Sequence, residues 1–168
     1  MAKQIIDIDA VRSVYPNYAS GQDVSPMVLV ESMLVLQNQE SNLTHLMVDA
    51  LKEVDSLKFQ LDKKKKEIES FLERNCVDLI STDSVPKEFR KNQDLTDYYI
   101  KYGSDKSSDY ETLVNESFEI EEKLVEAKSV HKKYDSLTNV VHGAINTAIQ
   151  VLSYLKHEEK ISGITRNI

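Results

Sequence analysis

Histidine and carboxylate side chains are the residues of this 168-residue chain that could bind a metal ion. His45 and Asp49 have the four-residue spacing that brings such a pair onto one face of a helix. Two ligands do not complete a metal site. His131, His142 and His157 are dispersed along one predicted helix, and we expect them to be solvated or partly packed. The sequence therefore predicts neither a metal nor a cofactor.

Residues that could act as nucleophiles show no catalytic pattern. No serine lies in a Gly-x-Ser-x-Gly motif, and Cys76, the only cysteine, has no histidine near it in sequence. Cys76 cannot form an internal disulfide, and we expect a structural role for its thiol. The segment 103–107 contains glycine and lysine but lacks the spacing and the preceding strand of a phosphate-binding loop, so a turn is expected. We therefore predict that the protein is not an enzyme.

The charge pattern disfavours nucleic acid and membranes as partners. The formal net charge is -7, whereas both ligands require a positive field. The basic run Lys63–Lys66 is bordered by acidic residues and has no interleaved aromatic side chain for base stacking. No stretch reaches about 18 apolar residues, so direct membrane insertion is not expected, and residues 1–10 lack the continuous apolar run of a secretory signal.

The composition and the apolar spacing predict an all-α fold. The chain contains 4 glycines, 3 prolines and no tryptophan, which favours long helices. A helix is expected to start at Ser25-Pro26, because proline fits the first helical position. From Leu29 to Phe71, steps of four and three residues meet apolar side chains except at Glu40 and Lys64. This period of about 3.5 residues is typical of a coiled coil.

A second long helix is expected from Ser108, where Glu111 completes a capping box, and its apolar stripe runs to Leu155. The intervening connector should contain short helices at 85–89 and 95–102, the latter closed by a left-handed Gly103.

Together these patterns predict a long antiparallel coiled-coil helical hairpin with a small helical connector. The predicted parts are an N-terminal segment 1–24, flexible or packed on the hairpin end, and a hairpin 25–168 with helices 25–75 and 108–160 around a connector 76–107. In this register Lys63–Lys66 would lie beside Glu119, Glu121 and Glu122. The predicted seam comprises Met33, Leu36, Leu43, Met47, Leu57, Leu61, Leu124, Val141, Ile145 and Leu152.

Two segments carry more apolar residues than one seam can bury, Met27–Leu36 and Val140–Leu155. Their surplus side chains should form one surface at the free end of the hairpin, used for self-association or for binding a partner chain. Alternatively, residues 1–24 cover it. The predicted interface residues are Val30, Leu34, Val35, Ile149, Val151 and Tyr154.

Several stretches resemble the EspA-type secreted filament proteins, the hydrophilic translocators of bacterial type III secretion systems. They are the Gln-rich segment Gln37–Leu43, the connector motifs Val85–Phe89 and Tyr98–Gly103, and the C-terminal Ile161–Ile164. The likeness spans about residues 25–168.

The resemblance implies a protein that is cytoplasmic before type III export and secreted or bound to the bacterial surface afterwards. It also implies self-assembly, a small helical cytosolic chaperone, other translocator proteins as partners and a part in delivering proteins into host cells. An alternative of another class is an intracellular helical assembly factor, such as a phage recombination mediator that acts on single-stranded DNA. The net acidity opposes this alternative.

Overall fold

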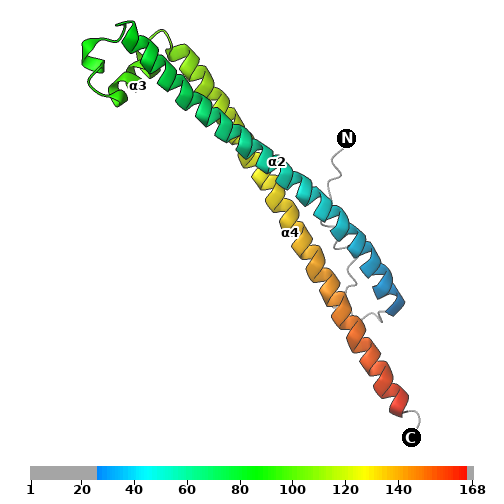
Figure 1. Cartoon of the computed structure of the whole chain (residues 1–168). Coiled ribbons are helices and arrows are strands. Elements are labelled where there is room, and N and C mark those ends of the chain that lie inside the picture. The colour runs from blue at the N-terminus through cyan, green and yellow to red at the C-terminus, as the bar shows by residue number, and fades with distance from the viewer. Residues whose placement is uncertain (1–25, 166–168) are drawn as a thin grey trace. The chain divides into compact units, whose positions relative to one another are not determined.

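The computed structural model describes the backbone of residues 26–165, which contains helices and turns but no strand. Two long helices, α2 (Pro26–Ser81) and α4 (Ser107–Thr165), pack against each other and are joined through η2 (Lys87–Phe89), a 3-10 helix, and α3 (Gln93–Tyr102) (Figure 1). The all-helical prediction is confirmed for this range. The predicted segment 1–24 lies outside it.

The great length of α2 follows from the scarcity of helix-breaking residues. Pro26 occupies the first position of the helix, where its missing amide hydrogen leaves no backbone bond unmade. No further proline and no glycine occurs before Ser81. The helix α4 contains two glycines, Gly143 and Gly163, and no proline. Each glycine weakens a helix only modestly, so α4 continues through both.

The helix α2 ends six residues later than predicted, at Ser81 rather than at residue 75. It ends in a left-handed turn at Asp83, whose φ of 57° lies in a region that glycine usually occupies. The amide of Ser84 donates to the carbonyl of Leu79 at 3.0 Å, which satisfies one of the last helical carbonyls. The sequence analysis missed this end because an aspartate, not a glycine, adopts the left-handed conformation.

The helix α4 begins one residue before its predicted start and ends beyond its predicted limit, at Ser107–Thr165 instead of 108–160. Ser108 therefore lies inside the first turn rather than ahead of it, and the capping role predicted for it is wrong. The hydroxyl of Ser107 donates instead to the carbonyl of Ser104 at 2.9 Å. The segment predicted to be a turn between helices is thus confirmed as one, and the connector is shorter than the predicted 76–107.

The connector has a small core of its own. Val85, Thr96 and Ile100 are buried. The hydroxyl of Thr96 donates to the carbonyl of Phe89 at 2.9 Å, so this buried polar group is satisfied. Asn92 caps α3 by accepting a hydrogen bond from the amide of Leu95. A satisfied core of this kind explains why the connector is ordered helix and turn rather than a long loop.

Gly103 closes α3, but not in the predicted way. Its φ is −128°, not left-handed, and the amides of Gly103 and Ser104 both donate to the carbonyl of Tyr99, at 2.8 and 2.9 Å. A Cβ placed at Gly103 would approach the Tyr99 ring to 2.9 Å. Close approach to this ring, rather than backbone handedness, is the reason for a glycine here.

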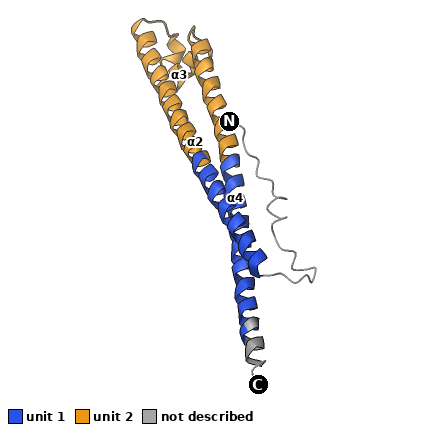
Figure 2. Ribbon diagram, turned by 90° about the vertical axis from the view of Figure 1, so that its right-hand side faces the viewer, with its two compact units in different colours: residues 1–49, 130–168 blue, residues 50–129 orange. Residues whose placement is uncertain are grey.

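The chain divides into two compact units (Figure 2). Unit 1 comprises residues 1–49 and 130–168, and unit 2 comprises residues 50–129. Both long helices contribute to both units.

Each unit has its own apolar cluster between α2 and α4. The cluster of unit 1 contains Leu36, Leu43, Leu137, Val141, Ala144 and Ile145, with Tyr134 packed against it. The cluster of unit 2 contains Val54, Leu61, Leu124 and Ala127, with Leu57 and Ile120 packed against it. Unit 1 buries Leu137 and Ala144, which lie beside the predicted stripe of α4 rather than on it. The buried face of α4 in unit 1 is therefore wider than a two-position seam.

The predicted seam residues lie on the inner faces of the two helices. Leu36, Leu43, Leu61, Leu124, Val141 and Ile145 are buried, and Met33, Met47, Leu57 and Leu152 are half-buried. Apolar side chains at a 3.5-residue spacing therefore supply the contact between α2 and α4 within each unit.

Candidate protein-interaction surfaces

Glu40, the first polar interruption of the α2 stripe, meets a partner on α4 in unit 1. Its carboxylate lies 2.8 Å from Nδ1 of His142. The sequence analysis expected His142 to be solvated or partly packed, and it did not foresee this pairing because the two residues are 102 positions apart.

Lys64, the second interruption, is held between two carboxylates in unit 2. Its ammonium group donates to Glu116 and also lies against Glu67, each at 2.8 Å. The pKa of Lys64 lies above its ordinary value because its ammonium group donates hydrogen bonds to both carboxylates. The bond to Glu116 has the larger effect and the bond to Glu67 the smaller one. A polar position in an apolar stripe is costly unless it is paired, and here the partner fixes which turn of α4 faces this turn of α2.

The observed pairing lies one turn from the predicted charge contact. Lys64 contacts Glu116, three residues before Glu119, whereas Glu121 and Glu122 line a hollow on the surface of α4. Lys63 and Lys66 are exposed. The basic run was predicted to lie beside Glu119–Glu122, and the observed contact is close to these residues but is made with Glu116 instead. Lys64, which occupies the seam position of the run, is the residue that makes this contact.

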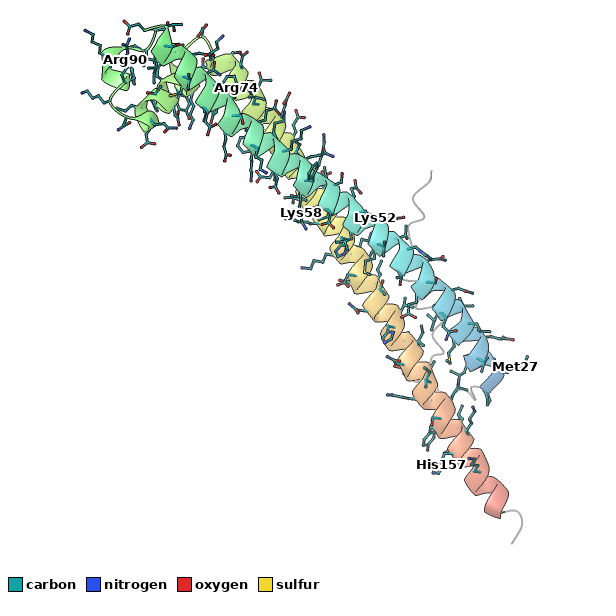
Figure 3. The ribbon with its side chains drawn as sticks, viewed as in Figure 1. Met27, Lys52, Lys58, Arg74, Arg90 and His157 are labelled. Atoms are coloured by element: carbon teal, nitrogen blue, oxygen red, sulfur yellow. The ribbon has the colours of Figure 1, made fainter. Side chains whose placement is uncertain are left out.

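The first candidate surface lies in unit 1 and is apolar. We call it the unit 1 apolar surface and define it as Met27, Val28, Val30, Leu34, Val35, Ile149 and Tyr154, all of which are exposed. Met27, labelled in Figure 3, is 71% exposed and Leu34 is 57% exposed. Of the predicted interface residues, only Val151 differs, since it is half-buried. The predicted cover by residues 1–24 lies outside the described residues.

The α2 part of this surface nearly surrounds the helix. Met27, Val30 and Leu34 follow one another at three and four residues and share one face, whereas Val28 and Val35 lie seven apart on another. The seam residues Leu29 and Leu36 are buried between these two faces. The contact with α4 therefore buries one side of α2 and leaves apolar side chains of α2 exposed on both sides of that contact.

The α4 part of the unit 1 apolar surface includes one polar group. The phenol of Tyr154 hydrogen-bonds to Glu158 one turn later, which raises the pKa of Tyr154 above its ordinary value. Its ring remains exposed, as does Ile149. Tyrosine combines an apolar ring with a polar end, a combination that is common at protein interfaces.

The second candidate surface lies in unit 2 on α4. A shallow hollow there is lined by Phe118 and Val125 together with Glu121, Glu122 and Glu126. Phe118 and Val125 are both exposed and lie seven residues apart, hence on one face. These two apolar residues were not singled out from sequence, because neither lies on the apolar stripe predicted for this helix.

A third surface is formed by aromatic residues of the connector and α3. Phe89 stacks on Tyr99 with ring centroids 5.3 Å apart, and Tyr98 lies against Tyr102 at 5.0 Å. Tyr98 and Tyr102 are exposed. The segment Tyr98–Gly103 was noted from sequence as a helix end and for its resemblance, and the structure adds that its tyrosines pack with Phe89 in one aromatic cluster.

Among the described residues, no three histidine, cysteine, aspartate or glutamate side chains gather closely enough to hold a metal ion. The thiol of Cys76 is half-buried, and burial, followed by the charge of Asp97, raises its pKa above the ordinary value. A raised pKa reduces the thiolate fraction, which is the opposite of what a nucleophilic cysteine needs.

None of the helices described between residues 26 and 165 has an apolar stretch long enough to cross a bilayer. Comparison with protein-family models gave no match, and searches of curated proteins and of solved structures gave none either.

Proposed function

We propose that the protein acts by binding other protein chains, as an extracellular filament or translocator subunit of a type III secretion system that helps deliver proteins into host cells. The observation that carries the binding role is the unit 1 apolar surface, which stays exposed on α2 and α4 while the seam between these helices is buried. Exposed apolar side chains in such number mark association sites. The secretion system enters through the sequence resemblance.

In this proposal α2 and α4 form an antiparallel coiled-coil hairpin. Contacts within unit 2 support the direction of the helices, because Val54 and Leu61 cluster with Leu124 and Ala127 whereas Lys64, later in α2, pairs with Glu116, earlier in α4. The 3.5-residue spacing of the buried positions supports the coiled-coil geometry. Such a hairpin presents apolar side chains to a partner from two helices at once.

Before export, a small helical chaperone is the proposed occupant of the unit 1 apolar surface. Met27, Val30 and Leu34 on α2 offer the three- and four-residue spacing that a partner helix can pack against. After export, the same residues would contact other copies of the chain or other translocator proteins. Mutually exclusive use of one surface would keep the protein from assembling too early.

Export is tested by producing a tagged copy of the protein in bacteria with a functional type III apparatus and in matched bacteria lacking its needle. The proposal expects the protein in the medium or on the cell surface only in the first strain, with a cytosolic protein absent from both fractions as a lysis control. Retention in the cytosol of both strains would contradict it. Salt-sensitive binding of the retained protein to single-stranded DNA would instead favour the recombination-mediator alternative.

A further inference from the structure

The outward face of α2 in unit 2 combines an exposed aromatic ring with positive charge. Phe59 is 72% exposed, and Lys63 and Lys66 follow it at four and seven residues, which places the three side chains on one helix face. Asp55, one turn before Phe59, is engaged by Lys58 at 3.1 Å. The positive charge of this basic face, defined as Phe59, Lys63 and Lys66, therefore lies on the C-terminal side of the ring.

The hollow on α4 of the same unit has the opposite character. Phe118 and Val125 supply its apolar floor, and Glu121, Glu122 and Glu126 supply its negative rim. All five side chains are exposed. We call these five residues the acidic face. An apolar floor within a charged rim resembles the centre and edge of a small protein interface.

We propose that the acidic face of one copy of the chain binds the basic face of another. The Phe59 ring would pack on the apolar floor between Phe118 and Val125, and Lys63 and Lys66 would meet the glutamates of the rim. Stacked or edge-on aromatic pairs stabilise contacts beyond the area they bury. Complementary charge sets the orientation and suppresses the pairing of two like faces.

This contact is heterologous, because different surfaces of the two copies meet. In a pair, one copy keeps its basic face unused and the other keeps its acidic face unused, so that further copies can add until a ring closes or an open polymer forms. The inference rests on the proposed self-association and gives it a second contact, separate from the unit 1 apolar surface. Exposed charges contribute weakly and are screened by salt, so this contact should be the salt-sensitive one.

The test is a set of charge reversals followed by sedimentation velocity. The variant Lys63→Glu/Lys66→Glu makes both faces acidic, and Glu121→Lys/Glu122→Lys makes both basic. Each alone is expected to weaken self-association at least about tenfold at low salt, because like charges then meet. An equimolar mixture of the two variants restores opposite faces, and association should return. The fourfold variant, which carries all reversals in one chain, should also associate by itself.

Rescue is the decisive readout, since a variant that merely misfolds cannot be restored by mixing. Helical circular dichroism of each variant serves as the folding check, and Glu69→Lys/Glu73→Lys, exposed changes elsewhere on α2, serves as the charge control. Undiminished association of both reversal variants, or loss without rescue in the mixture and the fourfold variant, would overturn the inference. A parent protein that is monomeric at every concentration would overturn it together with the proposed self-association.

Failure of this contact and failure of the proposed function remain distinguishable. Reversals at Lys63 and Lys66 leave Leu34 and Ile149 of the unit 1 apolar surface unchanged. Full association by the reversal variants, lost only when Leu34 and Ile149 are changed, would reject the contact between basic and acidic faces and retain the proposed function.

Discussion

Lys64 shows how one residue can break an apolar stripe without breaking the fold. Its side chain is only 18% exposed and is paired with Glu67 on its own helix and with Glu116 on α4. The pairing lowers the pKa of Glu67 and raises that of Lys64. A leucine here would bury more apolar area but would not distinguish one register of the helices from another.

We predict that Lys64 and Glu116 are energetically coupled. In a double-mutant cycle with Lys64→Ala and Glu116→Ala, urea unfolding should give a coupling free energy of about 0.2 to 1 kcal/mol, as is usual for a partly solvated pair. The exposed pair Lys58 and Asp55 is the matched control and should couple less, because both ends lie on one helix. Zero coupling across the helices would contradict the geometry.

The pairing of Lys64 with Glu67 predicts how the stability depends on pH. The folded pKa of Glu67 lies below its ordinary value of 4.5, so its contribution is present above that value and is lost as the pH falls through the folded pKa. The folded pKa of Lys64 lies above 10.5, so its contribution is present below 10.5 and is lost as the pH rises further. Between these limits the pair should add no pH dependence. Lys64→Ala should flatten both edges of the stability profile measured by urea unfolding.

At the scale of the elements, the helix interiors were predictable from sequence but their ends were not. A 3.5-residue apolar spacing needs no tertiary information, and it identified positions such as Leu43 and Val141 that are buried. The end of α2 depends on Asp83, an aspartate in a left-handed turn, for which the sequence carries no strong signal.

The contacts missed from sequence are long-range ones. The pairing of His142 with Glu40 and the extra burial of Leu137 depend on how the two helices face each other within unit 1, and a single helix pattern does not contain this information. The unit 1 apolar surface was predictable in outline, because the segments Met27–Leu36 and Val140–Leu155 contain more apolar residues than one seam can bury. The acidic face was not, because its two apolar residues, Phe118 and Val125, lie off the apolar stripe of α4.

Two glycines give a matched prediction about the helical elements. Gly103→Ala should lower the free energy of unfolding by about 1 to 3 kcal/mol, because the added Cβ would overlap the Tyr99 ring. Gly143→Ala should raise it by about 0.5 to 1 kcal/mol, because alanine favours the helix and its Cβ meets nothing within 4 Å. Thermal and urea unfolding measure both. Equal effects at the two sites would contradict the described packing.

The seam between the long helices should dominate stability. Leu43→Ala is expected to lower the free energy of unfolding by about 2 to 5 kcal/mol, since Leu43 is fully buried in the unit 1 cluster. Leu51, two residues past the unit 1 part of α2, is exposed, and Leu51→Ala should change stability by no more than about 0.5 kcal/mol. Guanidinium unfolding compares the two. A large loss at Leu51 would place the seam on another face of α2.

At the scale of the whole molecule, the proposed function depends on surfaces that the chain leaves exposed. The unit 1 apolar surface is suited to a partner helix or another copy, and the two charged faces of unit 2 are suited to each other across copies. An apolar contact and a charged contact respond differently to salt, because screening weakens only the second. Assembly can therefore be resolved into its two contacts by varying the ionic strength.

The central claim is that the protein associates through the unit 1 apolar surface, and the most direct test is its mass in solution. At salt concentrations that screen the charged faces, size-exclusion chromatography with light scattering should show an oligomer or polymer for the parent and a monomer for Leu34→Asp/Ile149→Asp, because burying an unpaired carboxylate costs more than the roughly 2 to 7 kcal/mol of an unpaired neutral polar group. Helical circular dichroism should be unchanged, since both side chains lie outside the seam.

The matched control is Val48→Asp/Val140→Asp, which adds the same charge at exposed apolar positions of the same two helices outside that surface. The account predicts that this control assembles as the parent does, at salt concentrations high enough to screen the charged faces. Parent-like assembly of the Leu34→Asp/Ile149→Asp protein under the same conditions would contradict the account.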